Sequence, residues 1–204
     1  MSARRRVVLV SVVALALVAA ACSTPAPTAS NAVPAAAIVD DAPVVWAAFG
    51  GNETRAFDPA SAWTQLVLAR LPASAELVEL ATEDATVESG RTAQMAALGA
   101  SARLPTVATI WFGIGEPGTS GAQFTASLTQ LVEALQAMGV PQIVVVARPD
   151  DPPGRRYRYA AEAEAVARST GVAFVSPSVP TGNPFEPAAQ TVIADELAPV
   201  IIGA

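Results

Sequence analysis

The feature that most constrains the fold of this chain is a regular alternation between two apolar patterns from Pro43 onward. Short continuous apolar runs, which suit strands buried on both faces, alternate with segments whose apolar residues recur at helical spacing. Strands are predicted at 44–49, 76–81, 106–112, 143–147 and 172–175, and helices at 58–71, 91–103, 120–138, 157–168 and 188–201. Because strands and helices alternate, the chain is predicted to form βαβ units.

The predicted fold class is α/β, a three-layer α/β/α sandwich around a central, mostly parallel five-stranded sheet. The first helix is predicted to begin at Asp58-Pro59, since this pair is typical of an N-cap and first helical residue. Trp63 and Trp111 fall on apolar faces and are predicted to lie in the core, whereas Trp46 could lie in the core or outside it. In such folds ligands bind outside the carboxyl ends of the strands, so functional residues are expected in the loops that follow them.

The N-terminus has the pattern of a bacterial export signal. Arginines 4–6 precede an apolar run at 7–21 that is interrupted only by Ser11 and is short for a membrane span. Small residues lead into Cys22, the only cysteine, as in a bacterial lipobox, although Ala19 stands where leucine is usual. With a single cysteine, no intrachain disulfide can form.

Three parts are therefore predicted. A lipoprotein signal peptide spans 1–21, a tether rich in proline, alanine and serine spans 22–41 and begins with lipidated Cys22, and a folded domain spans 42–204. The protein is expected on the extracytoplasmic face of the bacterial cell membrane, held there by the lipid on Cys22. The alternative is an ordinary secreted protein, cleaved at an Ala-x-Ala site, in which Cys22 has no such role.

Charge and side-chain chemistry exclude several functions. The chain has no histidine, which removes Ser-His-Asp and Cys-His nucleophilic sites and the commonest zinc ligand. Loss of the three signal-peptide arginines leaves nine basic against eighteen acidic residues, a net charge of −9. This balance argues against nucleic-acid binding and against a broad electrostatic attachment to anionic lipid.

Four blocks at predicted strand and helix ends point to a family. Residues 44–55, VVWAAFGGNETR, contain a hydrophobic strand followed by Gly-Gly-Asn and then Thr-Arg, and residues 84–86 are Asp-Ala-Thr. Residues 111–116, WFGIGE, end another strand, and residues 183–187, NPFEP, precede the last helix. In order and position these blocks resemble those of the SGNH (GDSL) hydrolases over roughly 43–202. The resemblance implies an SGNH-hydrolase-like, flavodoxin-like sheet arrangement.

In that family a first-block serine attacks the acyl carbon and a last-block histidine, oriented by an aspartate, takes its proton. Backbone N–H groups and a third-block asparagine hold the developing oxyanion. The chain departs at each position: Gly51 matches the aspartate before the serine, Asn52 the serine, Asp84 the second-block glycine, Gly115 the third-block asparagine, and Asn183 and Glu186 the last-block pair. The resemblance therefore implies a domain with no catalytic residues, because an amide is no comparable nucleophile.

Two groups of residues are candidates for ligand binding. Glu53, Glu116 and Glu186, with Asp84, are expected near the same strand ends. They could perform acid–base chemistry as in glycosidases, coordinate a hard cation such as Ca²⁺, or be solvated acids of an acidic protein. The second group is Arg155, Arg156 and Tyr157, which suit sugar, phosphate or protein contact, or simply form a solvated loop before a helix. No metal site and no cofactor are assigned.

The function predicted from these observations is that of a lipoprotein whose SGNH-like domain binds envelope glycans or proteins without hydrolysing them. An alternative is an esterase or glycan hydrolase that uses Glu53, Glu116 or Glu186. A third possibility is a structural envelope protein whose cleft has no remaining role. The loss of every family catalytic position with an intact hydrophobic framework favours the first.

Overall fold

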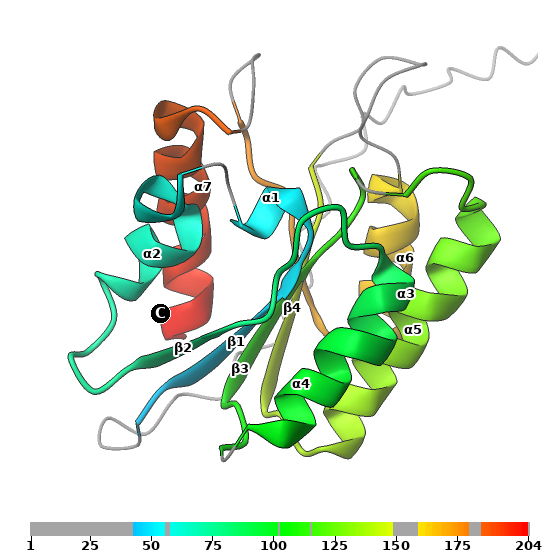
Figure 1. Cartoon of the computed structure of the whole chain (residues 1–204), viewed down its shortest axis with the longest axis horizontal. Helices are drawn as coiled ribbons and strands as arrows, with labels where there is room; N and C mark the ends of the chain where they lie inside the picture. Colours follow the sequence, from blue (N-terminus) through cyan, green and yellow to red (C-terminus); the bar gives the residue numbers. More distant parts are fainter. Residues whose placement is uncertain are drawn as a thin grey trace, which may run out of the picture. The chain divides into compact units, whose positions relative to one another are not determined.

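Five parallel strands form a single sheet in the order β2-β1-β3-β4-β5 (Figure 1). The computed structural model describes residues 43–55, 58–101, 103–114, 116–148, 159–179 and 185–203. The strands are β1 (Val45–Gly50), β2 (Glu76–Glu79), β3 (Val107–Trp111), β4 (Gln142–Val146) and β5 (Ala173–Val175). All five lie within the predicted ranges or one residue beyond them, and the predicted α/β fold class is confirmed.

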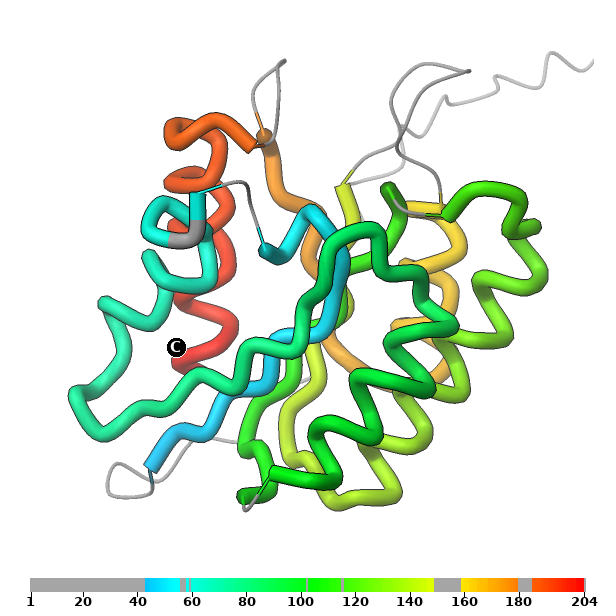
Figure 2. The backbone as a smooth tube through the Cα atoms, viewed as in Figure 1, coloured from blue at the N-terminus to red at the C-terminus, as the bar shows by residue number. Residues whose placement is uncertain are grey.

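Helices cover both faces of this sheet. They are α1 (Asn52–Arg55), α2 (Trp63–Leu68), α3 (Val87–Ser89), α4 (Met95–Ala100), α5 (Gly121–Ala137), α6 (Ala160–Thr170) and α7 (Pro187–Ile202). Two shorter turns are the 3₁₀ turn η1 (Pro59–Ser61) and the π-helical turn η2 (Gly90–Gln94). Helices α3 to α6 pack on one face and α2 and α7 on the other, as the backbone tube in Figure 2 also shows.

Side-chain alternation along the central strands builds the two cores. On β1, Ala47 and Phe49 join the core under α3 to α6, whereas Trp46 and Ala48 join the core under α2 and α7. This is the period of two that a strand imposes. The edge strands β2 and β5 are only partly buried, so the expectation that every strand is buried on both faces is wrong for them.

Three predicted helix starts are also wrong, each for a local reason. The Asp58 side chain accepts the N–H of Ala60 at 3.1 Å and opens only η1, so α2 starts at Trp63. The helix predicted from 91 starts earlier, because Thr86 and Ser89 form a capping box. The helix predicted from 157 becomes α6 at Ala160, because Tyr159 adopts a left-handed conformation with φ of 77°.

The membrane-related predictions concern residues outside the described part. Residues 1–42, which include Cys22 and both predicted N-terminal segments, are not among the described ones. In the part of the chain that the structure describes, no helix combines the length and apolarity that crossing a membrane needs. All described residues belong to one compact unit, Ala32–Ala204.

Candidate functional site

The strand order reverses between β1 and β3, and this reversal places the candidate site. In parallel α/β sheets, ligands bind at the carboxyl ends of the strands where the connections diverge to opposite sides. Here β2 follows β1 in the chain and lies on one side of it, whereas β3 lies on its other side. The connections therefore diverge at the ends of β1 and β3, where Gly50 is paired with Trp111. Helix α1 follows β1 directly at this point (Figure 1).

The turn after β1 requires glycine at Gly50. A Cβ atom there would lie 2.0 Å from Thr54 Oγ1 and 2.6 Å from the carbonyl oxygen of Trp111. The N–H of Gly51 donates to that same Trp111 carbonyl at 3.4 Å. The ends of β1 and β3 therefore lie close together at Gly50 and Gly51, and α1 begins at the next residue, Asn52.

Asn52, at the position of the family's serine, is held by two hydrogen bonds to one residue. Its Nδ2 donates to Asp84 Oδ1 at 2.9 Å, and its Oδ1 accepts the backbone N–H of Asp84 at 3.1 Å. Asp84 has φ of 53°, a left-handed conformation that glycine adopts freely and aspartate tolerates. Asp84, which matches the family's second-block glycine, therefore has a backbone conformation that glycine adopts readily.

This pairing has a direct chemical consequence. The backbone N–H of Asp84 already binds the side-chain oxygen of Asn52, so it is engaged within the chain. The side-chain nitrogen of Asn52 is likewise engaged, by a carboxylate. The residue at the position of the family's serine and the residue at the position of its second-block glycine therefore satisfy each other's polar groups.

Glu53 is a buried carboxyl group beside this pair, with 2% of its surface exposed. Its Oε1 accepts the N–H of Ile114, and its Oε2 has no hydrogen-bond partner among the described residues. Burial raises the pKa of Glu53 to about 7, with a smaller contribution from the nearby carboxyl of Glu116, while backbone hydrogen bonds oppose the rise. Glu53 is thus a group that changes charge near neutral pH.

The position of Glu53 explains why Gly51 stands where the family has aspartate. A Cβ atom on Gly51 would lie 3.0 Å from Glu53 Oε2 and 3.0 Å from the carbonyl oxygen of Ala85. Both distances are tighter than most real Cβ contacts. A side chain at 51 would therefore compete with the carboxyl group that Glu53 places there.

Glu116 lies near Glu53, and both of its side-chain oxygens accept hydrogen bonds from other residues of the chain. Oε1 accepts the N–H of Val87 at 2.6 Å, at the start of α3, and Oε2 accepts the hydroxyl of Thr119 at 3.1 Å. Burial raises the pKa of this carboxyl, which is 6% exposed. Glu116 therefore ties the loop after β3 to the N-terminus of α3.

Of the predicted residues not yet placed, the structure describes Glu186 alone. Glu186 is exposed at the N-cap of α7 and makes no side-chain capping bond. Gly115 and Asn183 lie outside the described residues, and so do Arg155, Arg156 and Tyr157. Within the described ranges, no group of three or more acidic, histidine or cysteine side chains is placed to hold a metal ion.

Gln94 is a site residue that the sequence analysis missed. Its Nε2 donates to the carbonyl of Gly50 at 2.8 Å and its Oε1 accepts the Gly50 N–H at 3.1 Å. The π-helical turn η2 aims this side chain at the end of β1, and Gly90 allows the turn to pack against the ring of Phe112. The Thr86–Ser89 capping box was the sequence signal that could have placed this turn.

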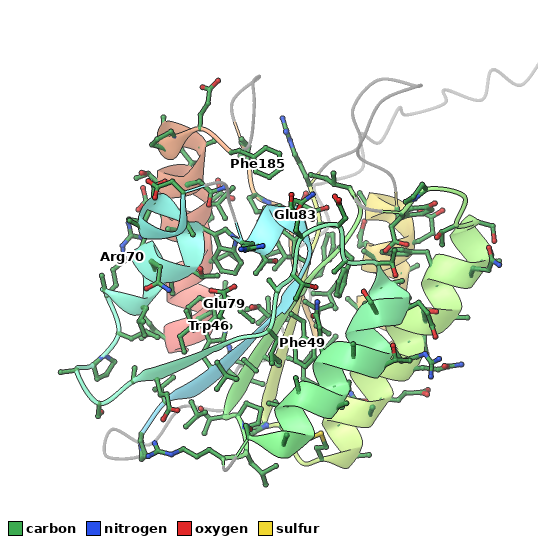
Figure 3. All side chains as sticks on the ribbon, viewed as in Figure 1. Trp46, Phe49, Arg70, Glu79, Glu83 and Phe185 are labelled. Atoms are coloured by element: carbon green, nitrogen blue, oxygen red, sulfur yellow. The ribbon has the colours of Figure 1, made fainter. Side chains whose placement is uncertain are left out.

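Three tryptophans form a buried cluster next to α1. Trp63 Nε1 donates to the carbonyl of Glu53 at 3.2 Å, and the Trp63 ring packs between Trp46 and Trp111 with centroid distances of 5.5 and 6.0 Å. Trp46 Nε1 donates to Thr109 Oγ1 at 3.0 Å. All three are buried, so the core positions predicted for Trp63 and Trp111 are confirmed, and Trp46 joins them. Figure 3 labels Trp46.

Solved structures with this fold include bacterial esterases and lipolytic proteins. An esterase, EstA from Pseudoalteromonas sp., aligns with a TM-score of 0.63 and 19% identity over 77% of this chain and 96% of its own. A member of the lipolytic protein G-D-S-L family from Veillonella parvula gives 0.63 and 14% over 77% and 97%. The lipase/acylhydrolase from Enterococcus faecalis gives 0.55 and 14% over 76% and 95%.

These alignments establish the architecture. Another solved neighbour with 20% identity is described as an SGNH-hydrolase family esterase. No family model and no curated protein sequence matches the chain. At such identities the likeness shows the fold alone, and the fold is that of the SGNH hydrolases, as the sequence blocks predicted.

Proposed function

We propose that this protein is a membrane-anchored envelope lipoprotein whose SGNH-fold domain binds a glycan or protein of the bacterial envelope and does not hydrolyse esters. The anchor is the lipid that we propose on Cys22. The binding surface lies at the C-terminal ends of the strands, around Asn52 and Asp84. Its neighbours of known structure are esterases and lipases, so a ligand carrying acyl or sugar groups is the natural class to test.

The observation that carries this proposal is the reciprocal pairing of Asn52 and Asp84. A serine hydrolase needs a free nucleophile and free donors for the oxyanion. In this chain an amide stands at the nucleophile position and its oxygen accepts the N–H of Asp84. Loss of a single oxyanion donor typically costs about 10²–10³ in rate, and here the nucleophile and the histidine base are replaced as well.

Hydrolysis of a short-chain ester, p-nitrophenyl acetate, tests the non-catalytic part. We expect the purified chain to release nitrophenol no faster than buffer, and Asn52→Ala and Glu186→Gln to behave identically. Turnover by the native chain above the rate in buffer would refute the non-catalytic part of the proposal. An active serine esterase in the same assay is the positive control.

Binding to envelope components tests the second part. Sedimentation with insoluble peptidoglycan and retention on immobilised envelope proteins would be compared for the native chain, Glu83→Arg and Glu133→Arg. Glu83 is exposed beside Asp84, whereas Glu133 is exposed on α5. We expect charge reversal at Glu83 to weaken binding and the matched reversal at Glu133 to leave it unchanged; no retention on either material counts against a binding role.

Mass spectrometry of the mature N-terminus tests the anchor. We expect the chain to begin at Cys22 and to carry the mass of attached acyl groups. A mature chain that begins at Cys22 or nearby with an unmodified thiol would support the secreted alternative instead.

A second candidate function rests on Glu53. A general base works best when its pKa is close to the operating pH, and the pKa of Glu53 is about 7. A hydrolase that uses this carboxylate would show a pH-dependent rate and would lose activity in Glu53→Gln. Full activity in Glu53→Gln, if any hydrolysis is found, would remove this candidate.

A further inference from the structure

One carboxyl oxygen of Glu53 has no hydrogen-bond donor among the described residues. Oε1 of this side chain accepts the N–H of Ile114, whereas Oε2 is buried and has no partner there. The whole residue is 2% exposed. A buried acceptor without a donor is unfavourable, so a donor from outside the chain would stabilise this group.

Gly51 keeps a side chain away from this oxygen. A Cβ atom at Gly51 would lie 3.0 Å from Glu53 Oε2 and 3.0 Å from the carbonyl oxygen of Ala85. Two acceptor oxygens therefore face the space that a side chain at position 51 would fill. We call this space, between Gly51, Glu53 Oε2 and the Ala85 carbonyl, the Gly51 notch. A group that enters the notch must be narrow and must bring more than one hydrogen-bond donor.

The charge around the notch is negative. Glu116 is the charged group that acts on Glu53 from the loop after β3, and together with burial it raises the pKa of Glu53 to about 7. None of the ion pairs in the described part of the chain includes Glu53. The chain also contains no lysine, so none of its own side chains can bring an ammonium group to this carboxylate. The other charged groups on the adjoining segments are exposed: Arg55, Glu83, Asp84 and Glu88.

We propose that the Gly51 notch receives a primary ammonium group, which a peptide ligand carries on an unbranched alkyl stem, and that Glu53 Oε2 and the Ala85 carbonyl accept its hydrogen bonds. This inference rests on the proposed binding function and names the chemistry of its ligand. An ammonium group is a compact charge with three donors, so it can serve two acceptors in a narrow space. A guanidinium is a planar fork with five donors and is wider than one missing side chain.

The ligand would enter between α1 and the segment that joins β2 to α3, which passes beside α1 in Figure 1. Asn52 follows Gly51 and Asp84 precedes Ala85, and the two hydrogen bonds between Asn52 and Asp84 join these segments. Both bonds are exposed to solvent, so water competes for them. Because Glu53 itself is buried, the ligand must reach inward past this pair. A stem of methylene groups does so, whereas an amino group attached directly to a sugar ring does not.

Amide chemical shifts in nuclear magnetic resonance test the site in the purified chain. Nα-acetyl-lysine amide is titrated into isotope-labelled protein at pH 8, and Nα-acetyl-norleucine amide serves as the matched ligand without the ammonium group. We expect saturable shifts with the lysine ligand only. They should include the amides of Gly51, Glu53 and Ala85 and the indole of Trp63, which donates to the carbonyl of Glu53.

Two variants locate the bound ammonium group. Glu53→Gln keeps the size of the side chain without its charge and should lower the affinity at least about 30-fold, since it removes one member of a buried charge pair. Gly51→Ala keeps Glu53 and fills the notch, so it should also abolish the shifts. Glu133→Gln removes an exposed charge on α5 and should leave the affinity unchanged. If Gly51→Ala does not fold, Glu53→Gln still decides the result.

The affinity should also depend on pH through Glu53. The ligand's ammonium group keeps its proton up to about pH 10, whereas the pKa of Glu53 is about 7. Only the ionised carboxylate pairs with an ammonium group, so we expect the affinity to rise about tenfold from pH 6 to pH 8. In Glu53→Gln this rise should be absent.

The contrary outcomes separate this inference from the proposed function. Equal shifts with the lysine and norleucine ligands, or an unchanged affinity in Glu53→Gln, overturn the ammonium site. Glucosamine that binds as tightly as the lysine ligand overturns the alkyl stem, and Nα-acetyl-arginine amide that does so overturns the compact charge. If peptidoglycan or envelope proteins retain the native chain and Glu53→Gln equally, the proposed function stands and this inference falls. If neither material retains the chain, the proposed function itself falls.

Discussion

Replacing Glu53 by glutamine is expected to improve the stability of the protein at alkaline pH relative to its stability at acid pH. Glutamine keeps the size of the side chain and an oxygen to accept the N–H of Ile114. It removes the charge that Glu53 acquires when it loses its proton, and it places an NH2 group where Oε2 has no hydrogen-bond partner among the described residues, at a cost that is the same at every pH. The change with pH in the difference of unfolding free energy between the two chains therefore isolates the cost of the buried charge.

The magnitude follows from the two pKa values. In the unfolded chain the Glu53 carboxyl has its ordinary pKa of 4.5, and in the folded protein its pKa is about 7. At about 1.4 kcal/mol per pH unit, this interval corresponds to about 3 kcal/mol. Below pH 4.5 both states hold the proton and the group contributes nothing. Between 4.5 and 7 only the folded state holds it, so stability falls as pH rises, and above 7 the full cost is present.

Urea unfolding followed by far-ultraviolet circular dichroism at pH 4.5, 6 and 8 measures this difference. We expect the free energy of unfolding of Glu53→Gln, relative to that of the native chain, to rise by about 3 kcal/mol between pH 4.5 and pH 8. Glu83→Gln is the matched control, because its side chain is 71% exposed and carries no burial cost. A Glu53→Gln advantage that does not change with pH would refute the reasoning, since it would have another origin than the proton.

Three further substitutions test the frame around the site. Gly50→Ala should lower the free energy of unfolding by about 2–3 kcal/mol in urea titrations, because its Cβ would lie 2.0 Å from Thr54 Oγ1; an unchanged midpoint would contradict this close approach. Gln94→Ala should cost about 2–4 kcal/mol in the same assay, since it leaves the N–H and carbonyl of Gly50 without this partner, and a loss below 1 kcal/mol would show that water replaces the amide. Tyr159→Phe removes the hydroxyl that donates to the carbonyl of Thr119 and should cost about 1 kcal/mol by thermal unfolding; a larger loss would mean that the stacking on Phe124 is also disturbed.

The strands were predictable from sequence because their environment is simple. Val44 to Phe49 and Val107 to Trp111 are buried on both faces, so continuous apolar runs mark them without ambiguity. The start of a helix depends on single capping side chains, and several nearby residues can offer such a cap. At Asp58 a good capping residue forms only a 3₁₀ turn, because Ala62 is extended and interrupts the helix.

The location of the candidate site could be predicted from the sequence, whereas its hydrogen-bond partners could not. The position of a strand end follows from the fold, which placed Asn52, Asp84 and the two buried glutamates at one edge. Which oxygen meets which N–H depends on distances of a few tenths of an ångström between segments far apart in sequence. For this reason the sequence did not show that the oxygens of Glu116 accept the N–H of Val87 and the hydroxyl of Thr119.

The tryptophan cluster gives the site an optical signal of its own. Trp63 binds the backbone of Glu53 and lies between two other buried indoles at centroid distances of 5.5 and 6.0 Å. Indoles this close couple electronically and exchange excitation, so their near-ultraviolet circular dichroism and emission depend on the geometry of α1. A ligand that displaces Asn52 or Glu53 would thus change the spectrum of the unlabelled protein, and a library of glycans can be screened by light alone.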